Sequence, residues 1–399
     1  MPFDVAGVRR CFPALADGTA FFDGPGGSQV PSEVAAAMAS AMTSGISNRG
    51  GVTASELRAE QIVANARAAV ADLLGCTADG VVFARSATQA TFDVARALAK
   101  QWAPGDEVVV TRLDHDANIR PWVITAGAVG AAVRWASFDR DTADLTVDDI
   151  ADQLSERTRL VAVTGASNLL GTRPDLPTIT DAVHDAGALL CVDGVHLTPH
   201  APIDVAALGA DLYTCSPYKF LGPHHGLLVA DPDLLRSMSP DKLLPSPDAV
   251  PDRFELGTLP YEVLAGTTAA IDFIAGLASQ ASDRRSRVLE SMAAVEEHEQ
   301  RLFTRLVDGL SSLDAVTVHG AAKRRTPTAL FSVTGHDPGA VYRHLARRGV
   351  NAPAGSFYAV EAARWMGLPA GGAVRAGLAP YTDEEDVDRL LDGVAELSR

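Results

Sequence analysis

Short apolar runs alternate with longer amphipathic stretches through the first two thirds of the chain. The run Leu160-Val161-Ala162-Val163 is apolar throughout, which is typical of a strand buried on both faces. We expect helices between such strands, and their spacing predicts right-handed βαβ units and a mostly parallel sheet. The expected strands are Val81–Ala84, Glu107–Thr111, Ala132–Ala136, Leu160–Thr164, Leu189–Asp193, Leu212–Cys215 and Gly226–Ala230, with helices at Thr88–Trp102, Ala117–Ala128 and Leu176–Ala186.

The pattern changes after about residue 280. Residues 282–310 predict one long charged amphipathic helix, followed by two strands, Ala329–Val333 and one near Val374–Leu378, and a helix at Pro338–Arg348. A last helix begins near Asp383, where Thr382-Asp383-Glu384-Glu385 supplies an N-cap and an acidic first turn. We expect a large domain over residues 21–265 and a smaller α/β domain made of residues 1–20 and 266–399.

Composition narrows the class of protein. The 399 residues are 47% hydrophobic and carry a formal net charge of −16, which fits a globular protein with a large core and excludes a disordered chain. The acidic balance argues against a nucleic-acid binder, which needs a basic surface. The four cysteines form no CxxC pair, and the chain shows neither a signal segment nor an apolar run that could span a membrane. We therefore expect free thiols, no membrane association and a cytoplasmic location.

Polar clusters follow the predicted strands. Ligands of open α/β sheets bind at the carboxyl ends of the strands, so we expect these clusters to converge on one cleft. The clusters are Ser86-Ala87-Thr88, Asp114-His115-Asp116, Ser167-Asn168, Asp193-Gly194-Val195-His196 and Ser216-Pro217-Tyr218-Lys219.

Local motifs with a well-defined mechanism are absent from the sequence. It has no GxGxxG fingerprint, no GxxxxGK[ST] loop and no GxSxG elbow. His196 and His200 are four residues apart, but Pro199 between them argues against a helical metal-binding face. The sequence leaves open a metal-dependent hydrolase that would use His115, Asp116 and His196, although we expect no metal.

An acid at one strand end and a lysine after the next strand suggest a different chemistry. Asp193 closes an apolar strand, and Lys219 follows the next one. A pyridoxal 5'-phosphate (PLP) enzyme needs both, because the lysine amine condenses with the cofactor aldehyde and the carboxylate keeps the pyridine nitrogen protonated. The phosphate needs backbone N–H groups at a helix start, which Ser86-Ala87-Thr88 supplies.

At this point the chain resembles the class V aminotransferase family of fold-type I PLP enzymes, nearest its cysteine desulfurase branch. The resemblance covers almost the whole chain and implies a mostly parallel seven-stranded sheet with a smaller C-terminal α/β domain. Its marks are Phe22-Asp23-Gly24, Arg85-Ser86-Ala87-Thr88-Gln89-Ala90, Asp114-His115-Asp116-Ala117-Asn118-Ile119 with Pro121-Trp122, Ser167-Asn168 with Gly171-Thr172, Val192-Asp193-Gly194, Ser216 with Lys219 and Gly222-Pro223, Arg253-Phe254-Glu255 with Gly257-Thr258, and Val374-Arg375-Ala376.

The resemblance also implies roles for individual residues. Lys219 would bond the cofactor and shuttle the proton, Asp193 would pair with the pyridine nitrogen, and His115 would stack on the ring. Arg375 would bind the substrate carboxylate with a bidentate fork. Gly257 and Thr258 would reach the phosphate in a neighbouring subunit, which implies a homodimer. The other implied cofactor contacts are Ala87, Thr88 and Ser216 at the phosphate, and Asn168 near the phenolic oxygen.

Four departures from the desulfurase pattern limit what the resemblance implies. His196 stands where the family usually has Gln, and Tyr218 where it usually has His, and both keep a hydrogen-bonding group near the cofactor. Tyr358 aligns with the persulfide-forming cysteine, and Pro353 with a second carboxylate-binding arginine. Desulfuration needs a thiolate that carries the sulfur away, so we expect poor sulfur transfer.

The sequence therefore leaves several functions open. The first is a PLP-dependent lyase that acts on an amino acid, with C–S lyase chemistry and without the persulfide cysteine. The second is an aminotransferase or epimerase of the same fold, and the third is a non-catalytic scaffold that keeps the fold. Neither the substrate nor the role of Tyr358 follows from the sequence.

Overall fold

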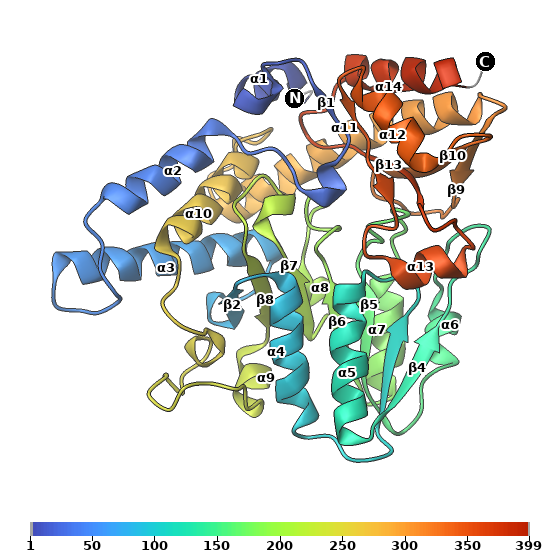
Figure 1. The fold of residues 1–399 in the computed structure, drawn as a ribbon. Helices are drawn as coiled ribbons and strands as arrows, with labels where there is room; N and C mark the ends of the chain where they lie inside the picture. Colours follow the sequence, from blue (N-terminus) through green and yellow to red (C-terminus); the bar gives the residue numbers. More distant parts are fainter. Residues whose placement is uncertain (1–2, 398–399) are drawn as a thin grey trace.

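The computed structural model describes residues 3–397, and a seven-stranded sheet lies at its centre (Figure 1). Across the sheet the strand order is β2-β8-β7-β6-β5-β3-β4. β8 runs antiparallel to both neighbours, and every other neighbouring pair is parallel. The predicted strands are confirmed, with β5 starting earlier than expected. They are β2 (Val81–Ala84), β3 (Glu107–Thr111), β4 (Ala132–Ala136), β5 (Thr158–Thr164), β6 (Leu189–Asp193), β7 (Leu212–Cys215) and β8 (Gly226–Ala230).

Helices cover both faces of this sheet, which explains the uninterrupted apolar runs. Successive residues of a strand point to opposite faces. Val108 and Val110 of β3 pack in one core cluster with α4 and α5, whereas Val109 packs in another with α3, α7 and α10. These helices are α3 (Ala54–Leu74), α4 (Ala87–Ala99), α5 (Arg120–Val129), α7 (Leu176–Asp185) and α10 (Tyr261–Ala275).

A smaller antiparallel sheet with its own core lies above the carboxyl ends of the large sheet (Figure 1). Its strand order is β12-β13-β10-β9, and the N-terminal strand β1 pairs in parallel with β11 beside it. The strands are β1 (Ala20–Phe21), β9 (Val316–His319), β10 (Thr328–Val333), β11 (Val350–Asn351), β12 (Ala354–Gly355) and β13 (Ala373–Gly377), and the helices packed there are α11 (Arg284–Ser311), α12 (Pro338–Ala346) and α14 (Glu384–Leu397).

Residue 265, where we expect the large domain to end, lies inside α10. The division into two domains stays a prediction. The predicted helix over 117–128 is in fact a short 3-10 turn followed by α5, because Pro121 favours the first turn of a helix. The remaining helices are α1 (Val5–Arg10), α2 (Ser32–Thr43), α6 (Val147–Ala151), α8 (Val205–Leu208), α9 (Pro232–Ser237) and α13 (Val360–Trp365).

No helix within residues 3–397 combines the length and the apolar character that crossing a membrane requires.

Candidate active site

A cavity of about 760 Å³ opens between the carboxyl ends of the large sheet and the small sheet. Its floor comes from segments that follow β2, β3, β5, β6 and β7, and its roof from residues 25–26, 357–358 and 375. The polar clusters after the strands therefore converge, as the sequence predicts. All predicted site residues except Gly257 and Thr258 line this cavity. Those that line it are Ala87, Thr88, His115, Asn168, Asp193, His196, Ser216, Tyr218, Lys219 and Arg375.

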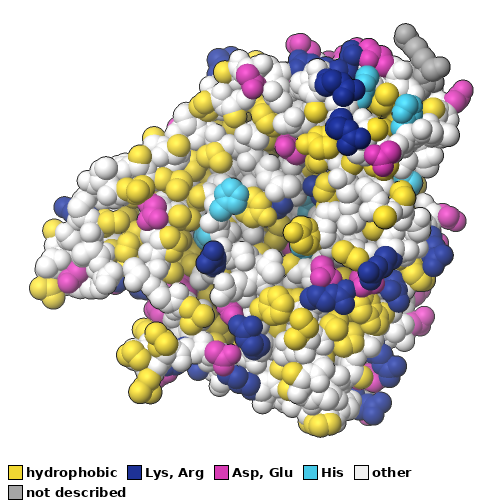
Figure 2. Space-filling model, in the orientation of Figure 1, with side chains coloured by type: hydrophobic (Ala, Val, Ile, Leu, Met, Phe, Trp, Pro, Cys, Tyr) yellow, Lys and Arg dark blue, Asp and Glu magenta, His cyan; other side chains and the backbone are white. Residues whose placement is uncertain are grey.

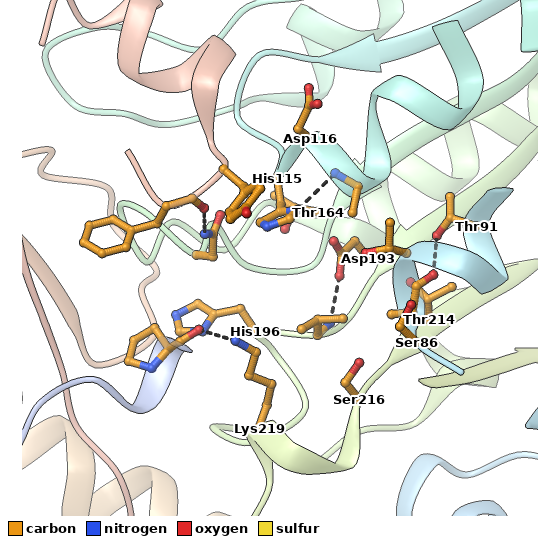
Figure 3. A pocket seen from close by; sticks show the side chains of 18 of the residues that line it. Ser86, Thr91, His115, Asp116, Thr164, Asp193, His196, Thr214, Ser216 and Lys219 are labelled. Atoms are coloured by element: carbon orange, nitrogen blue, oxygen red, sulfur yellow. Dashed lines mark hydrogen bonds between the residues drawn. The ribbon is translucent and has the colours of Figure 1, made fainter. Parts of the chain in front are cut away.

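Asp193, at the end of β6, and Lys219, in the turn after the neighbouring strand β7, face the middle of the cavity (Figure 3). Lys219 Nζ donates a hydrogen bond to the carbonyl oxygen of Pro25 at 2.5 Å. Burial and the nearby charge of Arg375 lower the pKa of Lys219 to about 7, while Asp193 opposes the shift. Burial raises the pKa of Asp193 to about 6. The backbone N–H of Val195, which donates to Oδ1 at 2.9 Å, lowers the pKa and so opposes part of this shift. At neutral pH the site thus holds a carboxylate and an amine that is partly uncharged.

His115 forms part of the cavity wall as a neutral imidazole. Burial and the charges of Lys219 and Arg375 lower its pKa to about 4. Its Nδ1 accepts a hydrogen bond from the backbone N–H of Ala117 at 3.0 Å, so the ring hydrogen sits on Nε2. The ring of Tyr358 stacks against it, with 5.5 Å between centroids.

The loop that carries Phe357 and Tyr358 is strained and held from both sides. Both residues have positive φ angles, 52° and 61°, which non-glycine residues rarely adopt. Asn168 Nδ2 donates to the carbonyl oxygen of Phe357 at 2.8 Å, and the N–H of Asp116 donates to that of Tyr358 at 2.9 Å. These bonds place the ring of Phe357 on Arg375 and the ring of Tyr358 on His115.

Arg375 enters the cavity from β13 and is 2% exposed. Its Nη1 donates to the backbone oxygen of Asn168 at 2.8 Å, its guanidinium lies 3.7 Å from the centroid of the Phe357 ring, and its Nε has no partner. Burial lowers its pKa to about 9, which the carboxyl group of Asp23 opposes, so the side chain remains charged at neutral pH. A buried cation with a free N–H is suited to binding an anion such as a carboxylate.

The N-terminus of α4 forms the opposite end of the cavity. Ser86 caps the helix, its hydroxyl accepting from the N–H of Gln89 at 3.1 Å, while Ala87 and Thr88 line the cavity. Gly226 of β8 lies directly against the Ser86–Ala87 peptide, where no side chain would fit. The first N–H groups of a helix lack intrahelical partners and bind anions.

His196 and Tyr218 have additional partners outside the cavity. His196 Nε2 lies 2.9 Å from the hydroxyl of Thr328, and the ring of Tyr218 stacks on His224 with 4.6 Å between centroids. Gly257 and Thr258 lie on the surface away from the cavity, with Gly257 at φ +83°.

Within residues 3–397, no group of three or more His, Cys, Asp or Glu side chains is arranged to hold a metal ion. Two of the three residues that a metal-dependent hydrolase would use already have other partners. Asp116 forms an ion pair with Arg120 at 2.8 Å, and His196 contacts threonine hydroxyls. The four cysteines all lie within the described residues, and none of them lines the cavity. Cys191 and Cys215 are buried in β6 and β7, and burial raises the pKa values of both thiols.

The comparisons with known proteins bear on the whole chain. A family model described as "Aminotransferase class-V" matches residues 20–390. The chain belongs to the class V aminotransferase family. An aminotransferase-like protein of Gibberella zeae is 34% identical over 98% of this chain and 97% of its own. The solved cysteine desulfurase CsdA of Escherichia coli has a TM-score of 0.86 and 27% identity, covering 100% of this chain and 99% of its own.

A more distant solved structure of this fold, called C-DES, has a TM-score of 0.81 and 21% identity over 97% of this chain and 99% of its own. It is described as a variant with glycine covalently linked to its PLP cofactor. Class V membership and the α/β fold, with a mostly parallel seven-stranded sheet and a smaller C-terminal sheet, are thus confirmed.

The sequence predicts that the loops around Gly24–Ser28 and Gly355–Tyr358 form part of the pocket of this class V protein, but it gives no individual role to Pro25, Phe357 or Asp114. Pro25 accepts the hydrogen bond of Lys219 with its backbone carbonyl, a contact that no side-chain pattern predicts. Phe357 reaches Arg375 through a positive φ angle, which its residue type does not predict. Asp114 lies below the cavity, fully buried, and burial raises the pKa of its carboxyl to about 8. Asp114 belongs to the predicted polar cluster Asp114-His115-Asp116, although no role of its own was predicted for it.

Proposed function

We propose that this protein is a PLP-dependent enzyme that acts on an amino acid through lyase chemistry. The observation that carries the proposal is that Lys219 and Asp193 face one cavity, with His115 on its wall and the N-terminus of α4 at its end. The sequence contains only four lysines, Lys100, Lys219, Lys242 and Lys323, and Lys219 is the one that lines this cavity.

The residues present fit this cofactor. Asn168 Oδ1 and Arg375 Nε are buried polar atoms without partners, as expected where a polar ligand belongs. Lys219 would hold PLP covalently through its amine, Asp193 would pair with the ring nitrogen, and His115 would cover one ring face. The polar edge of the cofactor ring would contact Asn168, His196 and Tyr218. The phosphate group of the cofactor would contact Ala87, Thr88 and Ser216.

Each side chain then has a defined task. PLP, when bound, withdraws electrons from the carbon that loses its proton. Lys219 takes that proton on Nζ, for which its pKa of about 7 suits it near neutral pH. Arg375 fixes the carboxylate of the substrate, and Asp193, ionised above a pKa of about 6, keeps the ring nitrogen charged.

Sulfur transfer through a protein persulfide is not part of the proposal. It would need an exposed thiolate at the cavity. Tyr358 occupies the place that the resemblance assigns to the persulfide cysteine, and no cysteine follows Cys215 in the sequence. Burial raises the pKa of Cys76 to about 12, and Cys11 is likewise outside the cavity. We therefore favour elimination that releases a free thiol or a related leaving group.

Transamination is the second candidate. It is favoured by the lack of a cavity cysteine and by the 34% identical relative described as aminotransferase-like. The two reactions differ in their products, because elimination releases a keto acid, ammonia and a thiol without an amino acceptor. Transamination instead consumes an acceptor for each keto acid formed.

We also propose that the enzyme works as a homodimer. Gly257 and Thr258, assigned by the resemblance to a partner's phosphate site, are exposed here. Figure 2 shows apolar side chains gathered over the arm formed by α2, α3 and α10. A contiguous exposed apolar patch usually marks an interface. The exposed apolar side chains of this arm include Met42 (68% exposed), Val52 (90%) and Leu57 (54%), and Leu256 (53%) is next to Gly257 in the chain.

The test begins with the purified protein incubated with PLP. We expect a visible absorption band that is absent from Lys219→Ala and retained by Lys242→Ala, the matched control. A screen of amino acids and S-conjugates with product mass spectrometry then separates elimination from transamination. Wild-type protein that stays colourless after reconstitution would refute the proposal, and a bound cofactor that responds to no amino acid would favour a scaffold.

A further inference from the structure

A buried carboxyl–imidazole pair lies directly behind the cavity and has no task in the proposed mechanism. Glu299 of α11 is 1% exposed and His200 is 4% exposed. His200 Nδ1 and Glu299 Oε2 are 2.8 Å apart, and Glu299 Oε1 has no partner. A buried carboxylate is costly unless it is paired, and the ring of His200 is the partner of Glu299 here.

The pair reaches the cavity through His196. The rings of His196 and His200 meet edge to face, with 5.1 Å between centroids. The turn after β6 places them together, since the N–H of His200 donates to the carbonyl of Leu197 at 3.0 Å. A charge on His200 therefore acts on His196 at short range, through protein instead of water.

The hydrogen bonds of His196 fix which ring nitrogen carries the hydrogen. The hydroxyl of Thr326 donates to the carbonyl of Gly171 at 3.3 Å, and a carbonyl can only accept. Thr326 Oγ1 must then accept from His196 Nε2, 3.1 Å away, while the hydroxyl of Thr328 lies 2.9 Å from the same nitrogen. His196 Nε2 thus holds the hydrogen, and a neutral ring leaves a lone pair on Nδ1.

Nδ1 is open to the cavity. Within residues 3–397 the Nδ1 atom of His196 makes no hydrogen bond, and it is not among the completely buried atoms. His196 lines the cavity. Asn168 presents a second acceptor, because its Nδ2 is engaged by the carbonyl of Phe357 and its Oδ1 is left free. Burial, with the charges of His200, Arg375 and Lys219, lowers the pKa of His196 well below its usual value.

We propose that Glu299 and His200 are positioning residues that keep His196 neutral, so that Nδ1 accepts a hydrogen bond from a protonated group bound beside Lys219. The identity of that group rests on the proposed function. It is either the protonated ring hydroxyl of the cofactor or the ammonium group of the amino-acid substrate. Both groups carry a hydrogen that they can donate. A deprotonated ring oxygen of the cofactor has no such hydrogen and could not bind Nδ1 in this way.

The first experiment needs no cofactor, so its failure is separate from failure of the proposed function. Long-range ¹H–¹⁵N correlation spectra of the apoprotein distinguish protonated from bare ring nitrogens, and His196→Gln assigns the signals of His196. We expect a bare Nδ1 and a protonated Nε2 near neutral pH. A hydrogen on Nδ1, or on both nitrogens, would overturn the proposal.

Variants of Glu299 separate a charge effect from a structural one. Both Glu299→Gln and Glu299→Leu remove the carboxylate that would balance a positive charge on His200, next to His196. We expect Glu299→Gln and Glu299→Leu alike to raise the protonation midpoint of His196 by about one pH unit, or tenfold in the equilibrium. A purely structural role predicts instead that Glu299→Gln, which keeps the hydrogen bond, behaves like wild type.

His225 is the internal control. It is 4% exposed, its Nε2 lies 2.7 Å from the hydroxyl of Thr267, and that hydroxyl donates to the carbonyl of Val263. It therefore has the same hydrogen arrangement but a different neighbourhood, and its signals should not move in any Glu299 variant. If the Glu299 variants do not fold, His200→Asn removes the same charge and should give the same shift.

Spectra of the PLP-loaded protein then identify the donor. If the donor is the ring hydroxyl, His196→Gln changes the ratio of the two visible bands of the resting protein. If the donor is the substrate ammonium group, the resting spectrum is unchanged, and the amino-acid concentration for half-saturation rises at least tenfold. No change in either measurement would overturn the role of Nδ1 as an acceptor.

Discussion

The substitution Gly226→Ala tests how the fold holds the anion-binding end of the cavity. A Cβ at position 226 would lie within 3.0 Å of backbone atoms of Ser86 and Ala87, which form the start of α4. These atoms belong to backbone and cannot turn aside as a flexible side chain could. The whole N-terminus of α4 must therefore shift away from β8 to admit the methyl group.

The expected cost follows from that overlap. Overpacking of this kind lowers the free energy of unfolding by about 1–3 kcal/mol. The shift also misaligns the N–H groups at Ala87 and Thr88, and losing one charged hydrogen bond costs about 1.5–3 kcal/mol. The affinity of the apoprotein for PLP should then fall about 10- to 100-fold, because 1.4 kcal/mol corresponds to a factor of ten.

Equilibrium titration with PLP and denaturant unfolding measure the two effects. Gly127→Ala is the matched control, because Gly127 lies inside α5 and a Cβ there meets no atom within 4 Å. It should raise the free energy of unfolding by about 0.5–1 kcal/mol and leave PLP affinity unchanged. Wild-type stability and wild-type affinity in Gly226→Ala would refute the reasoning.

Three further predictions concern charges in and below the cavity. Arg375→Gln removes a cation that lowers the pKa of Lys219, so the pH midpoint for the rate of PLP attachment should rise from about 7, and an unchanged midpoint would contradict this. Phe357→Leu removes a cation–π contact of about 0.5–2 kcal/mol on Arg375, and the concentration of amino acid for half-saturation should rise about 2- to 30-fold. The folded protein holds the Asp114 pKa at about 8, above its ordinary value of 3.8, so stability attributable to this carboxyl is lost as pH rises between those values. Asp114→Asn should therefore flatten the decline in the denaturation midpoint over that window, whereas an equal decline in both proteins would contradict it.

The strands could be predicted from sequence for a physical reason. A strand buried on both faces must be apolar at successive positions, and the runs in β3, β5 and β6 carry that pattern. The order of the strands has no such local signature, because it depends on how distant segments pair. The helix over 88–102 was placed correctly but ends at Ala99, since the ends of helices depend on capping and packing more than on periodicity.

The floor of the cavity was predictable, and so were Arg375 and the loops of the roof, but the contacts within the roof were not. Asp193 and Lys219 follow strands, so the rule that ligands bind at strand ends locates them. Phe357 reaches Arg375 only through a positive φ angle that its residue type disfavours. The pairing of His200 with Glu299 joins residues far apart in the chain and leaves no periodic trace in the sequence.

The electrostatics of the cavity connect substrate binding with proton transfer in the proposed function. The positive charge of Arg375 helps to lower the pKa of Lys219 to about 7, which leaves the amine partly uncharged and able to bond the cofactor. A substrate carboxylate bound to Arg375 would offset that charge, and the pKa of Lys219 would then rise. The same arginine thus favours an uncharged lysine before the substrate arrives and a more basic lysine once the substrate is in place, when a proton must be taken. Lysine in place of Arg375 would keep the charge but lose the planar fork, so it should preserve the first effect and weaken the second.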